Sequence, residues 1–169
     1  FNQDISSWNV SSGTRFNLMF AYADLMISNQ GVNRSPSPYD YFSYKFNTSS
    51  ALETAVNAWT TDIVAARSTY GDINNWNVSA VTDFSLLFEN KSSFNSAIGN
   101  WDVSSGTDFS YMFNGASTFD QNLSLWDVSS SNSLADMFLG TAMINSQGIS
   151  STPNTSYFDA TTGNDIITG

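Results

Sequence analysis

The sequence contains no cysteine and no histidine. Without cysteine the chain has no disulfide framework and no thiol nucleophile. Without histidine it lacks the commonest general base and metal ligand, which excludes Ser-His-Asp and Cys-His arrangements and most zinc sites. The absences therefore remove the most familiar kinds of catalytic centre.

Basic residues are also scarce. Five Lys and Arg stand against fifteen Asp and Glu, which gives a net charge of −10. Nucleic acids and anionic membranes attract clustered positive charge, so we expect neither as a partner. No apolar run approaches the roughly 18–20 residues that cross a bilayer, so we expect no direct membrane insertion.

Aromatic residues, in contrast, are abundant, at 15% of the chain, and they recur at fixed spacing. Trp76, Trp101 and Trp126 follow one another at intervals of 25 residues, and Trp8 marks an earlier copy. Repeats of this length are typical of proteins built from stacked structural units. The central copy shows the shared landmarks, which are Ile98, Trp101, Val103, Thr107, Phe109, Met112 and Phe113.

Each copy combines two periodicities. Ile-x-x-Trp-x-Val alternates at its end, as a short half-buried strand does, and Phe-x-x-Met-Phe has the i, i+3, i+4 spacing of a helical face. Residues suited to a helix N-cap precede that face, namely Thr14, Thr82, Thr107 and Asn132. The sequence therefore predicts an α/β fold, a leucine-rich-repeat-like solenoid of short parallel strands and short helices.

The regions between repeats predict the domain organisation. Ser50-Ala-Leu-Glu53 is a capping-box pattern that opens a predicted N-terminal capping helix at about 50–67. Met143–Gly148 followed by Tyr157-Phe158 echoes Met26–Gly31 followed by Tyr41-Phe42, and both stretches are predicted to be irregular exit-cap loops. We expect 1–46 to be the last repeat and exit cap of an upstream module, 47–159 a complete module, and 160–169 a linker or the start of the next. The chain begins in mid-repeat, so we expect a piece of a longer string of modules.

FNQDISSWNVSS and WDVSSGTDFSYMFNGASTF resemble the BspA-like surface-protein repeats, with their Phe-Asn-x-x-Ile-x-x-Trp-Asp-Val-Ser pattern. The resemblance covers most of 1–23 and 48–142, and departs from the pattern at Gly13, Gly106 and Ser131. It implies a leucine-rich-repeat-like fold on secreted or surface-anchored proteins, adhesion or binding roles, and no catalytic residues. The tail GNDIITG resembles one half-turn of the calcium roll of RTX proteins, which implies that Asp165 is a ligand for calcium.

Candidate ligand-facing residues follow from the predicted strands. Between Trp and Val lie Asn9, Asn77, Asp102 and Asp127, and after Val lie Ser11, Ser79, Ser104 and Ser129. Parallel strands about 4.8 Å apart would set Asp102 beside Asp127. Three interpretations are open: a solvated polar strip, a calcium ion bridging Asp102 and Asp127, or contact with a glycan or protein. The repeated tryptophans are expected in the core, with a sugar-stacking platform as the alternative.

The sequence also raises the questions of glycosylation and of glycosidase catalysis. Among the Asn-x-Ser/Thr sequences, Asn33 and Asn154 fall in predicted loops and are the better candidates for glycosylation. Two carboxylates near 5 Å apart would suit a retaining glycosidase. However, repetition already explains the pair, so we expect no enzyme.

The sequence therefore predicts an extracellular, secreted or cell-surface repeat protein that mediates adhesion or binds proteins or glycans without catalysis. The alternative is a structural subunit whose modules bind one another end to end in a surface filament or matrix. A polysaccharide-active enzyme is a remote third hypothesis. Calcium is the one cofactor that the sequence suggests.

Overall fold

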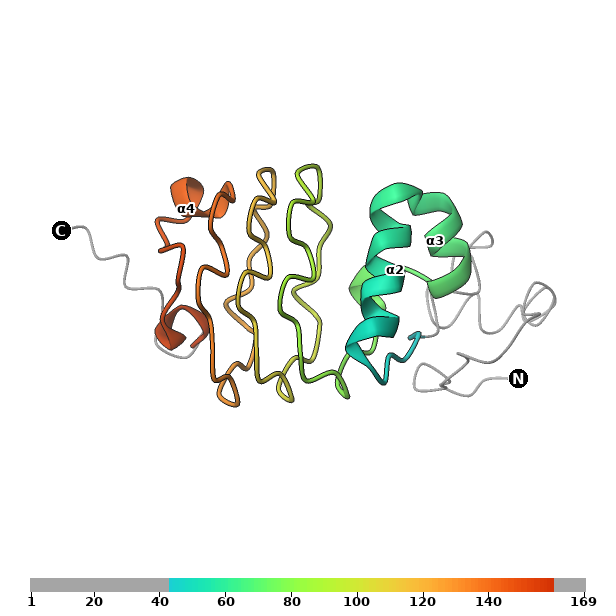
Figure 1. Cartoon of the computed structure of the whole chain (residues 1–169), viewed down its shortest axis with the longest axis horizontal. Coiled ribbons are helices and arrows are strands. Elements are labelled where there is room, and N and C mark those ends of the chain that lie inside the picture. The colour runs from blue at the N-terminus through green and yellow to red at the C-terminus, as the bar shows by residue number, and fades with distance from the viewer. Residues whose placement is uncertain (1–42, 160–169) are drawn as a thin grey trace, which may run out of the picture.

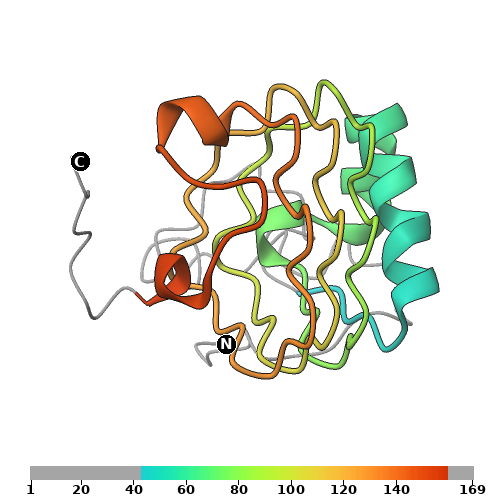
Figure 2. The ribbon, with the colours of Figure 1, turned by 60° about the vertical axis from the view of Figure 1, so that its left-hand side comes forward.

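The computed structural model describes residues 43–159, and every structural statement below concerns that range. Two entry helices, α2 (Ser49–Thr61) and α3 (Ile63–Tyr70), are followed by the 3-10 helix η2 (Ile73–Asn75). The repeats then form coils that lie side by side, and the exit cap with α4 (Met143–Ser146) and the 3-10 helix η3 (Thr155–Phe158) covers the last coil (Figures 1 and 2). Entry helices and exit cap thus cover opposite ends of the stack.

The entry region is two helices rather than the single predicted helix at 50–67. The hydroxyl of Thr48, not that of Ser50, caps α2 by accepting the N–H of Ala51. Asp62 adopts an extended conformation (φ −148°), and its carboxylate accepts the N–H of Ala65, so the chain ends one helix and caps the next at the same residue. The predicted stripe is buried at Leu52, Val56, Trp59 and Ala66, but Ile63 is exposed.

The coils are joined by a ladder of backbone hydrogen bonds. Every second N–H of one coil donates to the next coil, over N···O distances of 2.7–3.1 Å from Phe84, Leu86, Phe88 and Asn90 to Asp108, Ser110, Met112 and Asn114. The intervening N–H groups of Leu87, Glu89 and Lys91 donate three residues back within their own coil. The same alternation joins Phe109, Tyr111, Phe113 and Gly115 to the following coil. The backbone is therefore a ribbon of successive tight turns.

This ribbon replaces the short helices predicted for Phe-x-x-Met-Phe. Two positions of each coil have positive φ, the first at Leu86, Tyr111 and Asp136 and the second at Asn90, Gly115 and Gly140. A right-handed helix cannot contain such residues, and the bonds to a neighbouring coil take the place of helical ones. Thr107 accordingly caps no helix, since its amide and hydroxyl both donate to the carbonyl of Thr82.

The predicted strands are likewise not formed as such. Within residues 43–159 the only β pairing consists of isolated parallel bridges, Lys45–Asn77, Asp83–Asp108 and Asp108–Ser133. After each Trp-x-Val the chain turns at once, and the N–H groups of Val81, Gly106 and Ser131 donate to the carbonyls of Val78, Val103 and Val128. The same turn thus closes at three different residues, including the two, Gly106 and Ser131, that depart from the BspA-like pattern.

Stacked aromatic side chains fill the interior. Trp101 lies between Trp76 and Trp126, with ring centroids 6.2 and 6.4 Å apart, and each of these indoles is at most 3% exposed. Phe113 stacks between Phe88 and Phe138 in the same manner. The expected core role is therefore confirmed for these tryptophans, and a sugar-stacking platform is excluded for them. Trp8 lies outside the described residues.

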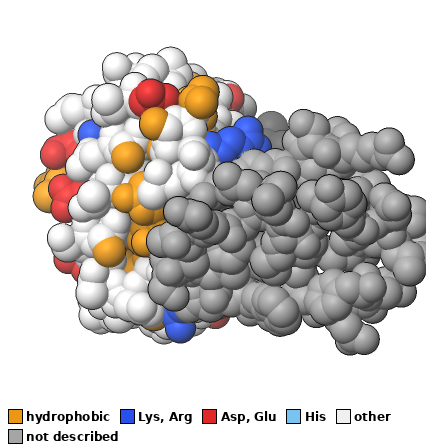
Figure 3. Space-filling model, turned by 90° about the vertical axis from the view of Figure 1, so that its right-hand side faces the viewer, with side chains coloured by type: hydrophobic (Ala, Val, Ile, Leu, Met, Phe, Trp, Pro, Cys, Tyr) orange, Lys and Arg blue, Asp and Glu red, His pale blue; other side chains and the backbone are white. Residues whose placement is uncertain are grey.

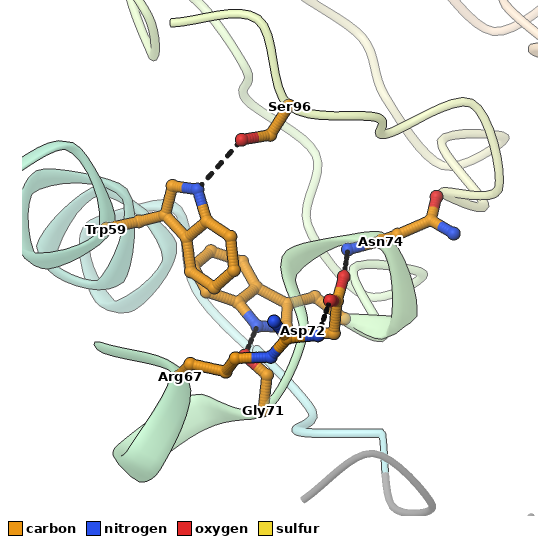
Figure 4. Close-up of polar contacts among 7 residues, drawn as sticks. Trp59, Arg67, Gly71, Asp72, Asn74 and Ser96 are labelled. Carbon is orange, nitrogen blue, oxygen red and sulfur yellow. Dashed lines mark hydrogen bonds and ion pairs between the residues drawn. The ribbon is translucent and has the colours of Figure 1, made fainter. Parts of the chain in front are cut away.

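A small polar cluster anchors the entry helices to the coils (Figure 4). The indole N–H of Trp59 in α2 donates to the hydroxyl of Ser96, at 3.0 Å. Asp72 forms an ion pair with Arg67 and accepts the N–H of Asn74 at 3.0 Å. These contacts fix the start of η2 and hence the register of the first coil.

The exit cap is held by a polar network around Asp120. The Asp120 carboxylate accepts the hydroxyl of Ser146 and, at 2.9 Å, the amide of Gln147. The Tyr157 hydroxyl donates to Gln147 at 3.0 Å and accepts the N–H of Leu123 at 3.3 Å. Burial raises the pKa of Tyr157, whereas the hydrogen bond from Ser146 and then that from Gln147 lower the pKa of Asp120.

We therefore expect acid to loosen the exit cap. Because the folded pKa of Asp120 lies below its ordinary value of 3.8, its contribution is fully present above that pH and is lost as the pH falls through the folded pKa. The midpoint temperature of thermal unfolding should thus change little from pH 7 to about 5, and it should decrease below about pH 4. The variant Asp120→Asn should lose part of that acid dependence, and an identical pH profile for both proteins would contradict the assignment.

Candidate functional site

In the described residues, the side chains predicted to face a ligand accept hydrogen bonds from the serines two residues further along the chain. Asn77 accepts the amide and hydroxyl of Ser79, and Asp102 accepts those of Ser104, at 2.6–3.2 Å. Asp127 accepts the amide of Ser129 at 2.9 Å. Each pair closes the tight turn that follows Trp-x-Val. The Asn9–Ser11 pair lies outside the described residues.

Asp102 and Asp127 are 25 residues apart, which is the same offset as that of the bridged residues Asp83, Asp108 and Ser133, and their predicted position side by side stays a prediction. Neither residue takes part in a parallel bridge of the described range. One bridge joins Lys45 to Asn77, and the others join Asp83, Asp108 and Ser133, which lie six residues further along each coil. The coils pair there because the ribbon of turns begins at that point and offers alternate N–H groups. Asp83 and Asp108 in turn accept the amides of Ser85 and Ser110.

The metal hypothesis finds no group of ligands in the described part of the chain. No set of three or more His, Cys, Asp or Glu is close enough there to hold a metal ion. The hydroxyl of Ser129, followed by its amide, lowers the pKa of Asp127, so hydrogen bonds already stabilise that carboxylate. Asp165 lies outside the described residues, and calcium binding by the tail stays a prediction.

One of the two glycosylation candidates lies within the described residues and the other does not. Asn33 lies outside the described residues. Asn154 is exposed and caps η3, where its side-chain oxygen accepts the amide and the hydroxyl of Ser156. The side chain of Asn154 therefore lies on the surface of the exit cap, and its glycosylation stays a prediction.

A surface that sequence reasoning missed lies on the outer side of the ribbon of turns. Leu86, Tyr111 and Leu139 are 51%, 39% and 42% exposed. The N–H of Leu86 donates to the carbonyl of Ser110, the residue before Tyr111 in the next coil. The N–H of Gly115 in that coil donates to the carbonyl of Leu139 in the last coil. Beside them Asn114 donates to Glu89 at 3.1 Å. We call these five residues the outer ribbon face.

The available signal for this face was variation within the repeat. The position two residues after Phe84, Phe109 or Leu134 is Leu86, Tyr111 or Asp136, while the next position keeps the same apolar type. If the segment is interpreted as a helix, this outward position is not recognised, because a helix places side chains on its outer face with a period of 3.6 residues. In the ribbon, this position has positive φ, and the side chains of Leu86 and Tyr111 there are exposed.

The class of protein follows from this geometry: a repeat protein whose 25-residue units stack through backbone ladders and whose turns carry varied outward side chains. A family model described as Mycoplasma protein of unknown function, DUF285, matches residues 1–59 and 63–162, and the chain belongs to that family. No curated protein and no solved structure matches the chain. Within the described residues, no helix is both long and apolar enough to cross a membrane.

Proposed function

We propose that this chain is a non-catalytic binding module of a secreted or surface-anchored protein, with a BspA-like repeat, that contacts a protein or glycan through the outer ribbon face. The assignment to BspA-like repeats is more specific than the match to the DUF285 family, and it rests on the Phe-Asn-x-x-Ile-x-x-Trp-Asp-Val-Ser pattern. Stacked 25-residue coils support a leucine-rich-repeat-like solenoid as the fold, built here with ribbons of turns in place of the predicted short helices.

The observation that carries the proposal is the combination of Leu86, Tyr111 and Leu139 on a rigid backbone. Apolar side chains that expose about half their surface, bordered by Asn114 and Glu89, provide both stacking area and hydrogen-bonding groups. The ladder on both sides of Tyr111 orders the backbone before any ligand binds, which lowers the entropic cost of binding. The former candidates Asp102 and Asp127 are weaker, because their carboxylates already accept hydrogen bonds from Ser104 and Ser129.

Binding can be tested with the double variant Leu86→Ser, Tyr111→Ser. Removing two central apolar contacts should weaken binding by at least ten-fold, because hot-spot residues each contribute more than about 1 kcal/mol. The probes are arrays of purified glycans and of extracellular-matrix proteins, followed by titration of whichever binds. Leu125→Ser is the matched control, since Leu125 is 78% exposed and lies off this face.

The outcomes separate the candidate functions. Binding that Leu125→Ser preserves and the double variant loses would support the outer ribbon face. Equal binding by all three proteins would exclude it as the contact surface. Light scattering on the same samples tests the alternative, a self-assembling filament subunit, which requires growth of large particles with concentration.

A further inference from the structure

The helix α3 is covered by very little of the described chain. It spans eight residues, of which Ala66 alone is fully buried, at 2% exposed. Ile63 and Val64 are 51% and 81% exposed. Helices this short gain their stability from packing an apolar face rather than from propensity. An exposed β-branched pair on such a helix therefore indicates a surface that packs against something else.

The position of the upstream chain identifies what that partner is. The ring of Tyr44 packs edge-on against Tyr70, the last residue of α3, with ring centroids 4.9 Å apart. The described range thus begins close to the C-terminal end of this helix. Figure 3 shows hydrophobic side chains in a strip on this end of the molecule. An eight-residue helix is only about 12 Å long, so a directly attached segment reaches all of it.

The sequence of that segment matches a described one. Met26–Gly31 and Tyr41-Phe42 correspond to Met143–Gly148 and Tyr157-Phe158. In the described copy, Met143 and Phe158 are buried as the exit cap closes the last coil, and Tyr157 packs edge-on against Phe138. The upstream counterpart of Phe158 is Phe42, which stands only two residues before Tyr44.

We propose that the Ile63–Val64 face of α3 is the docking surface for residues 24–42 of this chain, the exit cap of the preceding unit. Two successive units then meet through a packed apolar contact, and the entry helices serve as a joint between units as well as a cover for the first coil. A tandem array joined in this way is a stiff rod that presents successive outer ribbon faces at fixed spacing. The inference does not depend on what those faces bind.

The test is hydrogen–deuterium exchange of the full chain, read by mass spectrometry, for the native sequence and for Val64→Asp. An acidic side chain in the first turn of a helix is favourable, so the substitution keeps α3 helical while opposing apolar contact. We expect exchange to rise at least ten-fold both in 63–70 and in 24–42. Leu125→Asp is the control and should change neither, and exchange in 107–116 should be equal in all three proteins, which verifies the fold.

Two results would overturn the proposal. If Val64→Asp leaves the exchange of 24–42 at the native rate, that segment does not dock on α3. If the native protection of 63–70 rises with protein concentration between about 1 and 100 μM, the occupant is a second copy rather than the attached segment. Protection that is independent of concentration and lost in Val64→Asp supports intramolecular docking.

Discussion

Replacing Trp101 by Ala should lower the free energy of unfolding by about 3–5 kcal/mol, as expected for a large buried aromatic side chain. The indole is 3% exposed, stacks on tryptophans of both neighbouring coils, and donates its N–H to the carbonyl of Ile73 at 2.7 Å. The substitution leaves a cavity at the centre of the stack and removes one of the two hydrogen bonds that the carbonyl of Ile73 accepts, the other being from the N–H of Trp76. Urea unfolding monitored by circular dichroism measures the change.

Two controls separate these contributions. Trp101→Phe keeps an aromatic ring but removes the N–H donor, and we expect an intermediate loss of about 2 kcal/mol. Leu125→Ala removes a 78% exposed side chain and should change stability by less than about 0.5 kcal/mol. A loss below about 1 kcal/mol for Trp101→Ala would show that the coils do not share a continuous aromatic core.

Replacing Tyr111 by Pro should be as damaging, although this side chain is 39% exposed. Tyr111 has φ +58°, which proline cannot adopt, and its N–H donates to the carbonyl of Ala135 at 2.8 Å. Proline removes that bond and forces a change of backbone, at a cost of about 3 kcal/mol or more. The same urea experiment measures it.

The matched control is Tyr111→Gly at the same position. Glycine keeps the N–H and adopts positive φ without strain, so we expect a change within about 1 kcal/mol. Similar losses for Tyr111→Pro and Tyr111→Gly would indicate that the side chain matters here and the ladder does not. A large loss for proline alone supports the ribbon of turns.

Much of the packing could be predicted from the sequence. Fixed spacing identified the buried rows around Trp101 and Phe113, because a repeat places equivalent side chains at equivalent depth. The exit cap and the entry region were also located, since both interrupt the period. Apolar periodicity reports which side chains face the core, and it does so whether the backbone is helical or turned.

The backbone itself could not be predicted in the same way. Phe-x-x-Met-Phe has helical spacing, yet a ribbon of turns with positive φ at Tyr111 and Gly115 buries the same side chains. The deciding interactions are hydrogen bonds between residues about 25 apart, which local propensity does not contain. For the same reason the local contacts of the candidate site residues could not be predicted, and ligand contact at those residues stays a prediction. Asp102 was assigned to a paired strand, whereas it caps a turn, and the outward position of Tyr111 was read as helical surface.

The most direct test is an NMR measurement of scalar couplings across backbone hydrogen bonds, which connect a donor nitrogen to its acceptor carbonyl carbon. The structure predicts a coupling between the nitrogen of Phe88 and the carbonyl carbon of Met112, and another between Phe113 and Met137. A helix in each repeat would instead couple Phe88 to Phe84 and Phe113 to Phe109. Observing the couplings to Met112 and Met137 would support stacked ribbons of turns, and observing the helical pairs would contradict them.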